Sequence, residues 1–106
     1  MSDIIHLSGE GYEKLAASSE KTLLIDFYAD WCGPCRMLSP IIEEVAAENN
    51  DVIFCKVNTD DEPDLTRSFG LDSIPALLFI KNGEVAAKSV GLISKDELTR
   101  LIEANK

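Results

Sequence analysis

The stretch Trp31-Cys32-Gly33-Pro34-Cys35 stands between a predicted strand and a predicted helix. The apolar run before it, TLLIDFY at 22–28, is typical of a buried strand. After it, apolar residues recur at helical spacing at positions 38, 41, 42 and 45. Pro34 suits the first turn of this helix, where the N–H that proline lacks would have no partner in any case. The two cysteines are therefore expected where a strand passes into a helix.

This position favours redox chemistry. Cys32 would lie beside the unpaired amides and the positive end of the helix dipole, which stabilise a thiolate. Cys35 follows three residues later on the same helix face, close enough to pair with Cys32. The alternative is half of a zinc site, but zinc needs four ligands and only His6 and Cys55 remain, without the spacing of paired ligands. The pattern predicts a reversible dithiol switch with no metal.

Composition narrows the class of protein. A length of 106 residues predicts one domain over 1–106. The net charge of −9, from 19 acidic and 10 basic residues, argues against nucleic acid or an anionic membrane as a partner. No apolar run approaches the roughly 20 residues of a membrane span, and the first residues do not resemble a signal peptide. We expect a monomer in the cytoplasm, although a processed organellar protein would look the same.

The rest of the chain alternates between strand and helix patterns. Strands are expected at 4–7, 22–28, 52–58, 76–81 and 84–90, the last two joined by a hairpin turn at Asn82-Gly83. Residues 8–11 are expected to end the first strand, and a helix is expected at 12–17. Further helices are expected at 34–49 with a kink at Pro40, from 63 to about 69 with a cap from residues 60–62, and after a capping box at 94–97. The order predicts an α/β fold with a mixed sheet of about five strands and about four helices on its two faces.

The decapeptide Asp26-Phe27-Tyr28-Ala29-Asp30-Trp31-Cys32-Gly33-Pro34-Cys35 resembles the signature of the thioredoxin family, and the likeness extends over nearly the whole chain. It implies the thioredoxin fold and a thiol–disulfide oxidoreductase that reduces protein disulfides, with Cys32 as the attacking thiolate and Cys35 as the resolving thiol. The redox group would be the Cys32–Cys35 disulfide alone, with no bound cofactor. A separate thioredoxin reductase would recharge it, because the chain has no GxGxxG motif. The alternative is a non-catalytic interaction module that uses the same surface.

Two positions near the cysteines refine this expectation. Gly33-Pro34 resembles the reducing members of the family, since no histidine stands beside the second cysteine. Asp26 is an acid within an apolar run, so it is expected to be buried, to hold its proton to a higher pH and to exchange a proton with Cys35. The alternative is an exposed acid at the strand edge. Lys56, which interrupts another apolar strand, is either the partner of Asp26 or a solvated strand end.

A second segment is expected to face the cysteines. Ser73-Ile74-Pro75 resembles the family's loop with a cis proline, whose backbone pairs with substrate; the alternative is a trans proline that starts a strand. An apolar patch around Cys32 is predicted to bind substrate, and its residues are Trp31, Gly33, Pro34, Ile74, Pro75 and Gly91. Tyr28 and Ala76 depart from the family pattern, where tryptophan and threonine are commoner. Cys55 is interpreted as a buried core thiol and His6 as a plain strand residue.

Overall fold

The computed structural model describes residues 4–106. Strands and helices alternate along the chain at first, and a strand hairpin and a last helix then complete it. The elements are β1 (Ile5–His6), α1 (Gly9–Ser18), β2 (Leu23–Tyr28), α2 (Gly33–Glu48), β3 (Ile53–Asn58), α3 (Pro63–Ser68), β4 (Ala76–Lys81), β5 (Glu84–Val90) and α4 (Lys95–Asn105).

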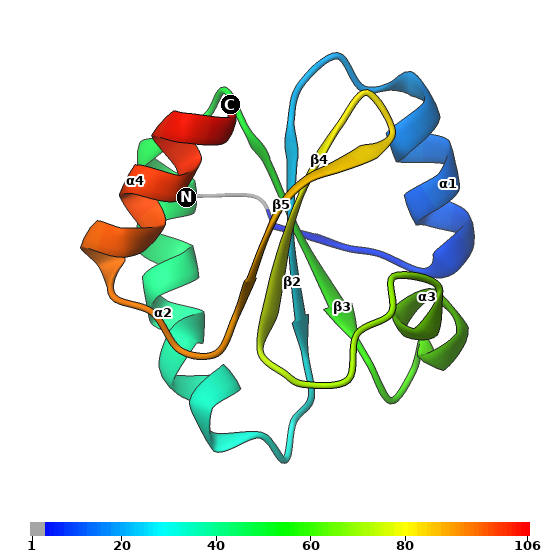
Figure 1. The fold of residues 1–106 in the computed structure, drawn as a ribbon, viewed down its shortest axis with the longest axis horizontal. Helices are drawn as coiled ribbons and strands as arrows, with labels where there is room; N and C mark the ends of the chain where they lie inside the picture. Colours follow the sequence, from blue (N-terminus) through cyan, green and yellow to red (C-terminus); the bar gives the residue numbers. More distant parts are fainter. Residues whose placement is uncertain (1–3) are drawn as a thin grey trace.

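The strands form one mixed sheet in the order β1-β3-β2-β4-β5. The pairs β1–β3 and β2–β3 are parallel, whereas β4 runs antiparallel to β2 and β5 antiparallel to β4. Helices α1 and α3 lie on one side of the sheet, and α2 and α4 lie on the other (Figure 1). The predicted fold class is confirmed, because the crossovers produce the parallel half and the hairpin adds the antiparallel half.

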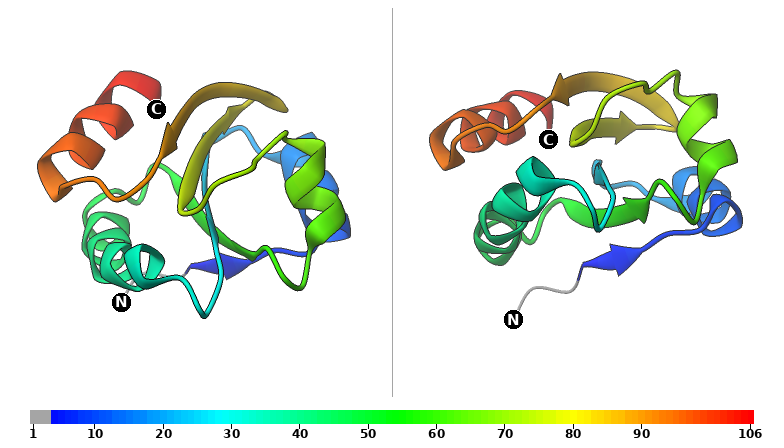
Figure 2. Two further views of the ribbon diagram at one scale, coloured as in Figure 1. Left: turned by 60° about the horizontal axis from the view of Figure 1, so that its bottom comes forward. Right: turned by 90° about the horizontal axis from the view of Figure 1, so that it is seen from below.

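Helices cover both sides of the sheet (Figure 2), and each side carries its own hydrophobic core. Alternation along β2 sends Leu24 toward α2 and α4, where Leu38 and Ile102 pack against it. It sends Ile25 and Phe27 into the other cluster, which α1 and α3 help to cover. Because β2 is covered on both faces, its first five residues are all buried, as a central strand of such a sheet requires. This packing on both faces fixes the position of the strand that leads to the cysteine pair.

Several local sequence signals are confirmed. Asn82 and Gly83 adopt φ values of 54° and 79°, the left-handed backbone that a tight hairpin turn requires. The Ser94 side chain accepts the Glu97 N–H, and the Glu97 carboxylate accepts the Ser94 N–H, which completes the predicted capping box. Helix α2 runs on through Pro40; the kink expected there stays a prediction.

Two expectations were wrong, namely the start of the first helix at 12 and a side-chain cap on the third helix from residues 60–62, and one contact explains both. The first strand ends before 8–11 as expected, but 9–11 already form the first turn of α1, because the Ser8 hydroxyl accepts the Gly11 N–H and a Glu62 carboxylate oxygen accepts the Gly9 N–H at 2.7 Å. The Glu62 side chain therefore caps α1 and makes no cap bond to its own helix, α3. The tertiary contact overrides the low helix propensity of the two glycines.

Cys55 provides a test of the core on the α1 and α3 side. Its side chain is buried in this cluster, and burial raises the pKa of its thiol to about 12. Cys55→Val keeps a similar volume and is expected to change the free energy of unfolding by less than about 1.5 kcal/mol and to leave redox activity intact. Denaturant melts and a disulfide-reduction assay check this. Lost activity in a stably folded variant would show that the third thiol has a function.

Candidate active site

The cysteine pair lies directly beyond the carboxyl end of β2, at the lower edge of the molecule in Figure 1. Cys32 is the N-cap of α2 and Cys35 lies in its first turn. The two residues form a disulfide, with their Cα atoms 5.2 Å apart. Ligand and redox sites of open α/β sheets commonly occupy this end of the strands. The placement expected from the sequence is confirmed.

The two sulfur atoms have different surroundings. Cys32 Sγ accepts the Cys35 N–H at 3.2 Å and lies 4.0 Å from the Ile74 carbonyl oxygen. A thiolate formed there on reduction would keep the amide and the helix N-terminus as stabilising partners. The residues are buried to a similar degree, at 5% exposed for Cys32 and 4% for Cys35. Position rather than exposure distinguishes them, because Cys35 lines a cavity behind the disulfide.

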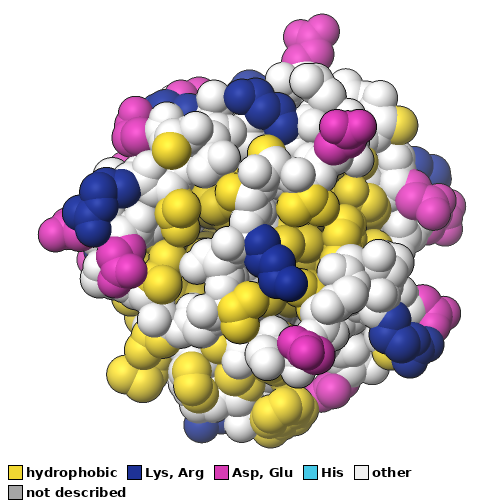
Figure 3. Space-filling view, in the orientation of Figure 1, with side chains coloured by type: hydrophobic (Ala, Val, Ile, Leu, Met, Phe, Trp, Pro, Cys, Tyr) yellow, Lys and Arg dark blue, Asp and Glu magenta, His cyan; other side chains and the backbone are white. Residues whose placement is uncertain are grey.

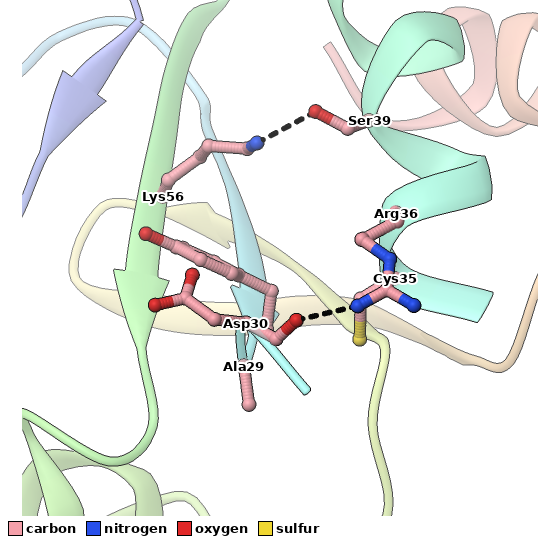
Figure 4. Close-up of a pocket in the computed structure, with 7 residues that line it drawn as sticks. Ala29, Asp30, Cys35, Arg36, Ser39 and Lys56 are labelled. Atoms are coloured by element: carbon pink, nitrogen blue, oxygen red, sulfur yellow. Dashed lines mark hydrogen bonds between the residues drawn. The ribbon is translucent and has the colours of Figure 1, made fainter. Parts of the chain in front are cut away.

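This cavity, of about 200 Å³, lies between α2 and the ends of β2 and β3 (Figure 4). Its lining residues are Tyr28, Ala29, Asp30, Cys35, Arg36, Ser39 and Lys56. The Arg36 guanidinium donates to the Asp30 carbonyl at 2.8 Å and so ties α2 to the loop that precedes it. The Lys56 ammonium reaches across from β3 and donates to Ser39 Oγ at 2.9 Å. Two cationic side chains thus line the cavity behind Cys35 in a strongly acidic protein.

Asp26 is buried, so the exposed strand-edge alternative was wrong. Its side chain is only 2% exposed, and Oδ1 has no hydrogen-bond partner within residues 4–106. Desolvation of the charged form raises the pKa of Asp26 to about 6, while the positive charge of Lys56 acts in the opposite direction. A carboxyl group with this pKa can take up or release a proton near neutral pH.

Lys56 is the cross-strand register neighbour of Asp26 in the parallel pair β2–β3. Its ammonium does not form an ion pair with that carboxylate in the described part of the chain. Instead it binds Ser39 and lies 5.0 Å from the centre of the Tyr28 ring. The two charges therefore interact at a distance rather than by contact.

The predicted patch residues lie around the disulfide. Ile74 packs against the buried cluster of Ala29, Cys32 and Cys35, and the Ile74–Pro75 peptide bond is cis. The Pro75 carbonyl accepts the Gly91 N–H at 2.8 Å, which joins the start of β4 to the end of β5, and Gly91 has a φ of 98°. Gly33 and Pro34 form the first turn of α2. Trp31 is 69% exposed and donates from Nε1 to Asp60 Oδ2 at 2.9 Å.

Sequence reasoning missed several residues of this site. Apolar side chains gather along the lower edge of the molecule (Figure 3). Three exposed apolar side chains close in the chain to the disulfide or to Gly91 are Met37, Val90 and Leu92. Asp60, which holds the Trp31 ring, and Ser39, which holds Lys56, were also missed. Only Ser39 had a sequence signal, since it follows Cys35 by four residues and so shares its helix face. The other contacts join residues far apart in the chain.

Across 4–106, no group of three or more His, Cys, Asp or Glu side chains is arranged to hold a metal ion. His6 lies in β1 and Cys55 in β3, as expected. None of the helices in this part of the chain is long and apolar enough to cross a membrane.

Comparisons with known proteins agree with the geometry. The thioredoxin family model matches residues 3–104. A thioredoxin of Haemophilus influenzae is 41% identical over 103 residues, which cover 96% of each chain, and one of Buchnera aphidicola is 40% identical over 106 residues, covering 99% of this chain and 98% of that one. The chloroplastic M-type thioredoxin of Pisum sativum is 42% identical over 98 residues, covering 92% of this chain and 57% of its own length. With its mixed sheet and its disulfide at the N-terminus of α2, this chain belongs to the thioredoxin family.

Proposed function

We propose that this protein reduces disulfide bonds in other proteins by dithiol–disulfide exchange through Cys32 and Cys35. The observation that carries the proposal is the disulfide at the N-terminus of α2, where Cys32 Sγ accepts the Cys35 N–H. Family membership supports a thiol–disulfide oxidoreductase. The helix N-terminus supplies the electrostatic field that a thiolate nucleophile needs.

The reaction takes place in two exchanges. The Cys32 thiolate attacks one sulfur of the substrate disulfide, so that a Cys32–substrate bond forms and the other substrate sulfur leaves as a thiolate. Cys35 then loses its proton, for which Asp26 is the proposed acceptor, and attacks Cys32 Sγ. The mixed disulfide breaks, and the second substrate sulfur leaves. Two electrons have passed from the dithiol to the substrate, and the Cys32–Cys35 disulfide has formed.

Reduction is the favoured direction, and it requires a partner that restores the dithiol. The Gly33-Pro34 pair places no histidine beside Cys35. The Cys32 thiolate therefore lacks the added stabilisation of an imidazolium, and the Cys32–Cys35 disulfide is a weaker oxidant. The family implies a thioredoxin reductase as the partner that returns the electrons.

The substrate segment would lie extended across the patch. The backbone beside the cis Ile74–Pro75 bond would pair with it in β fashion, with Trp31, Gly33, Pro34 and Gly91 as the flanking apolar contacts. The exposed side chains of Val90 and Leu92, which flank Gly91 in the chain, would widen this surface. We further propose that the chain acts as one domain, as a monomer and in the cytoplasm. A Cys-x-x-Cys pair without other paired cysteines is typical of reducing compartments.

Turnover of a disulfide-bonded reporter protein, with dithiothreitol as the recycling reductant, tests this function. We expect the wild-type protein to accelerate reduction of the reporter well above dithiothreitol alone, and both Cys32→Ser and Cys35→Ser to lose this acceleration. Cys55→Val is the matched control, because it removes the cysteine that lies outside the disulfide. Reporter binding without any turnover by the wild-type protein would instead favour the interaction module.

A further inference from the structure

The cavity behind Cys35 contains one contact that the proposed reaction does not use. The Lys56 side chain leaves β3 beside Asp26 but crosses to α2, where its ammonium donates to Ser39 Oγ at 2.9 Å (Figure 4). The Tyr28 ring lies 5.0 Å from the same ammonium, a distance at which a ring attracts a cation. The hydrogen bond ties the positive charge to α2, and the ring at the end of β2 gives the ammonium a second contact.

The strand register explains why this placement matters. Asp26 and Lys56 are direct register neighbours in two parallel strands, which lie roughly 4.8 Å apart. Side chains at one register position of adjacent strands point to the same face of a sheet. Lys56 could therefore reach the Asp26 carboxylate, and Oδ1 of that carboxylate has no partner within the described residues. The Lys56 ammonium thus binds the neutral hydroxyl of Ser39, although Lys56 is the register neighbour of the buried Asp26.

We propose that Ser39 is a positioning residue that, with Tyr28, holds the Lys56 ammonium away from Asp26 and so keeps Asp26 a proton acceptor suited to neutral pH. Within residues 4–106, the one buried side-chain oxygen or nitrogen without a hydrogen-bond partner is Asp26 Oδ1, at the register position beside Lys56. An ammonium that moved toward this oxygen would favour the carboxylate over the carboxylic acid. The role of Asp26 in this inference rests on the proposed function, whereas the effect of Ser39 on Lys56 does not.

Other charged and titratable groups also face Lys56 or the cavity. They are His6 on β1, Tyr28 and Asp30 at the end of β2, Cys35 and Arg36 on α2, and Asp61 and Glu62 beyond β3. On the other side of β2, the register neighbour of Asp26 is the uncharged Leu77 of β4. Burial raises the pKa of Tyr28, so its ring stays neutral through the range of interest. The Glu62 carboxylate already accepts the Gly9 N–H. His6 lines a second pocket together with Lys56, so it has its own control.

The direct experiment is a carboxyl titration of Asp26 by nuclear magnetic resonance in the oxidised protein, where neither cysteine of the disulfide titrates. Ser39→Ala is expected to lower the pKa of Asp26 by about one unit, the lower end of the range for an opposite charge brought within roughly 4–6 Å. Ser39→Thr keeps a hydroxyl and should restore the wild-type value. Ser18→Ala is the matched control, because Ser18 also lies on a helix and bonds only to carbonyl groups of its own helix.

A double-variant comparison shows whether the effect passes through Lys56. Lys56→Met should raise the pKa of Asp26, and adding Ser39→Ala to Lys56→Met should change it no further. His6→Gln should leave the difference between the wild-type protein and Ser39→Ala intact. An unchanged or raised pKa of Asp26 in Ser39→Ala, or an equal shift of that pKa in the Lys56→Met background, would overturn the positioning role of Ser39.

The same variants separate this inference from the proposed catalytic role. If Asp26 accepts the proton of Cys35, the lower limb of the pH profile for release of the mixed disulfide should move to lower pH in Ser39→Ala by the amount that the titration shows. Ser39→Ala could shift the pKa of Asp26 and yet leave the lower limb of the pH profile unchanged. Ser39 would then remain the positioning residue for Lys56, but Asp26 would have no part in the reaction.

Discussion

Cys35→Ser is expected to accumulate as a covalent complex with a disulfide-bonded substrate. In this variant, Cys32 keeps its position at the N-terminus of α2 and can still attack, but no thiol follows in the first turn to break the mixed disulfide. The trapped fraction should approach one substrate chain per protein at saturation. Non-reducing gel electrophoresis and intact mass measurement would detect it.

Cys32→Ser is the opposite control and should trap almost nothing. Its remaining active-site thiol, Cys35, lies within the first turn of α2 and lacks the N-cap position, where Cys32 Sγ accepts a helix N–H that would stabilise a thiolate. Both variants are best made with Cys55→Val, because the third thiol would otherwise complicate the mass balance. Equal trapping by both variants would show that the two sulfurs have interchangeable roles and would refute the division of labour proposed for them.

The parts of this fold that the sequence predicted well depend on local signals. The alternation of apolar runs with helical periodicity indicated β2 and α2, and Pro34 and the cysteines marked their junction. Asn82-Gly83 indicated the hairpin because few other residues adopt left-handed backbone readily. These signals extend over a few residues, so they need no knowledge of the tertiary structure.

The failures share a different physical origin. Nothing near Gly9 predicts that a carboxylate 53 residues away would accept its N–H and permit a helix there. The partner of Lys56 was ambiguous for a similar reason, because Ser39 on α2 competes with Asp26 on β2 and only packing decides between them. The burial of Asp26 was predictable from its apolar run, but the lack of a partner for Oδ1 was not. Side-chain pairing across the sheet and its helices therefore needs the structure.

Asp26→Ala is expected to stabilise the fold at neutral pH. The pKa of Asp26 rises from 3.8 to about 6 on folding, chiefly because burial disfavours the charged form. Between these two values the native state keeps a proton that the unfolded state has lost, so stability falls as pH rises through the window. At 1.36 kcal/mol per pKa unit, the buried charge costs about 3 kcal/mol at pH 7. An uncharged side chain avoids this cost.

The gain should disappear in acid, which distinguishes charge from packing. At pH 7 the small gap left by alanine offsets part of the gain, so we expect a net stabilisation of about 1–2 kcal/mol. As the pH falls below the unfolded-state pKa of 3.8, the wild-type carboxyl becomes protonated in both states, and little but the cost of the gap remains. Asp26→Asn is the matched variant of similar shape and no charge. Denaturant melts of the three proteins at pH 3.5 to 8 provide the comparison.

The same substitution should slow the reaction that the carboxylate serves. Without Asp26, the Cys35 proton has no buried acceptor, so release of the mixed disulfide near neutral pH is expected to slow at least about tenfold, and the limb of its pH profile near 6 should vanish. Attack by Cys32 on the substrate should change little, since its thiolate depends on the N-terminus of α2. Single-turnover kinetics at pH 5 to 9 would resolve the two steps. A variant that is more stable at neutral pH but releases substrate at the wild-type rate would show that the burial of Asp26 affects stability alone.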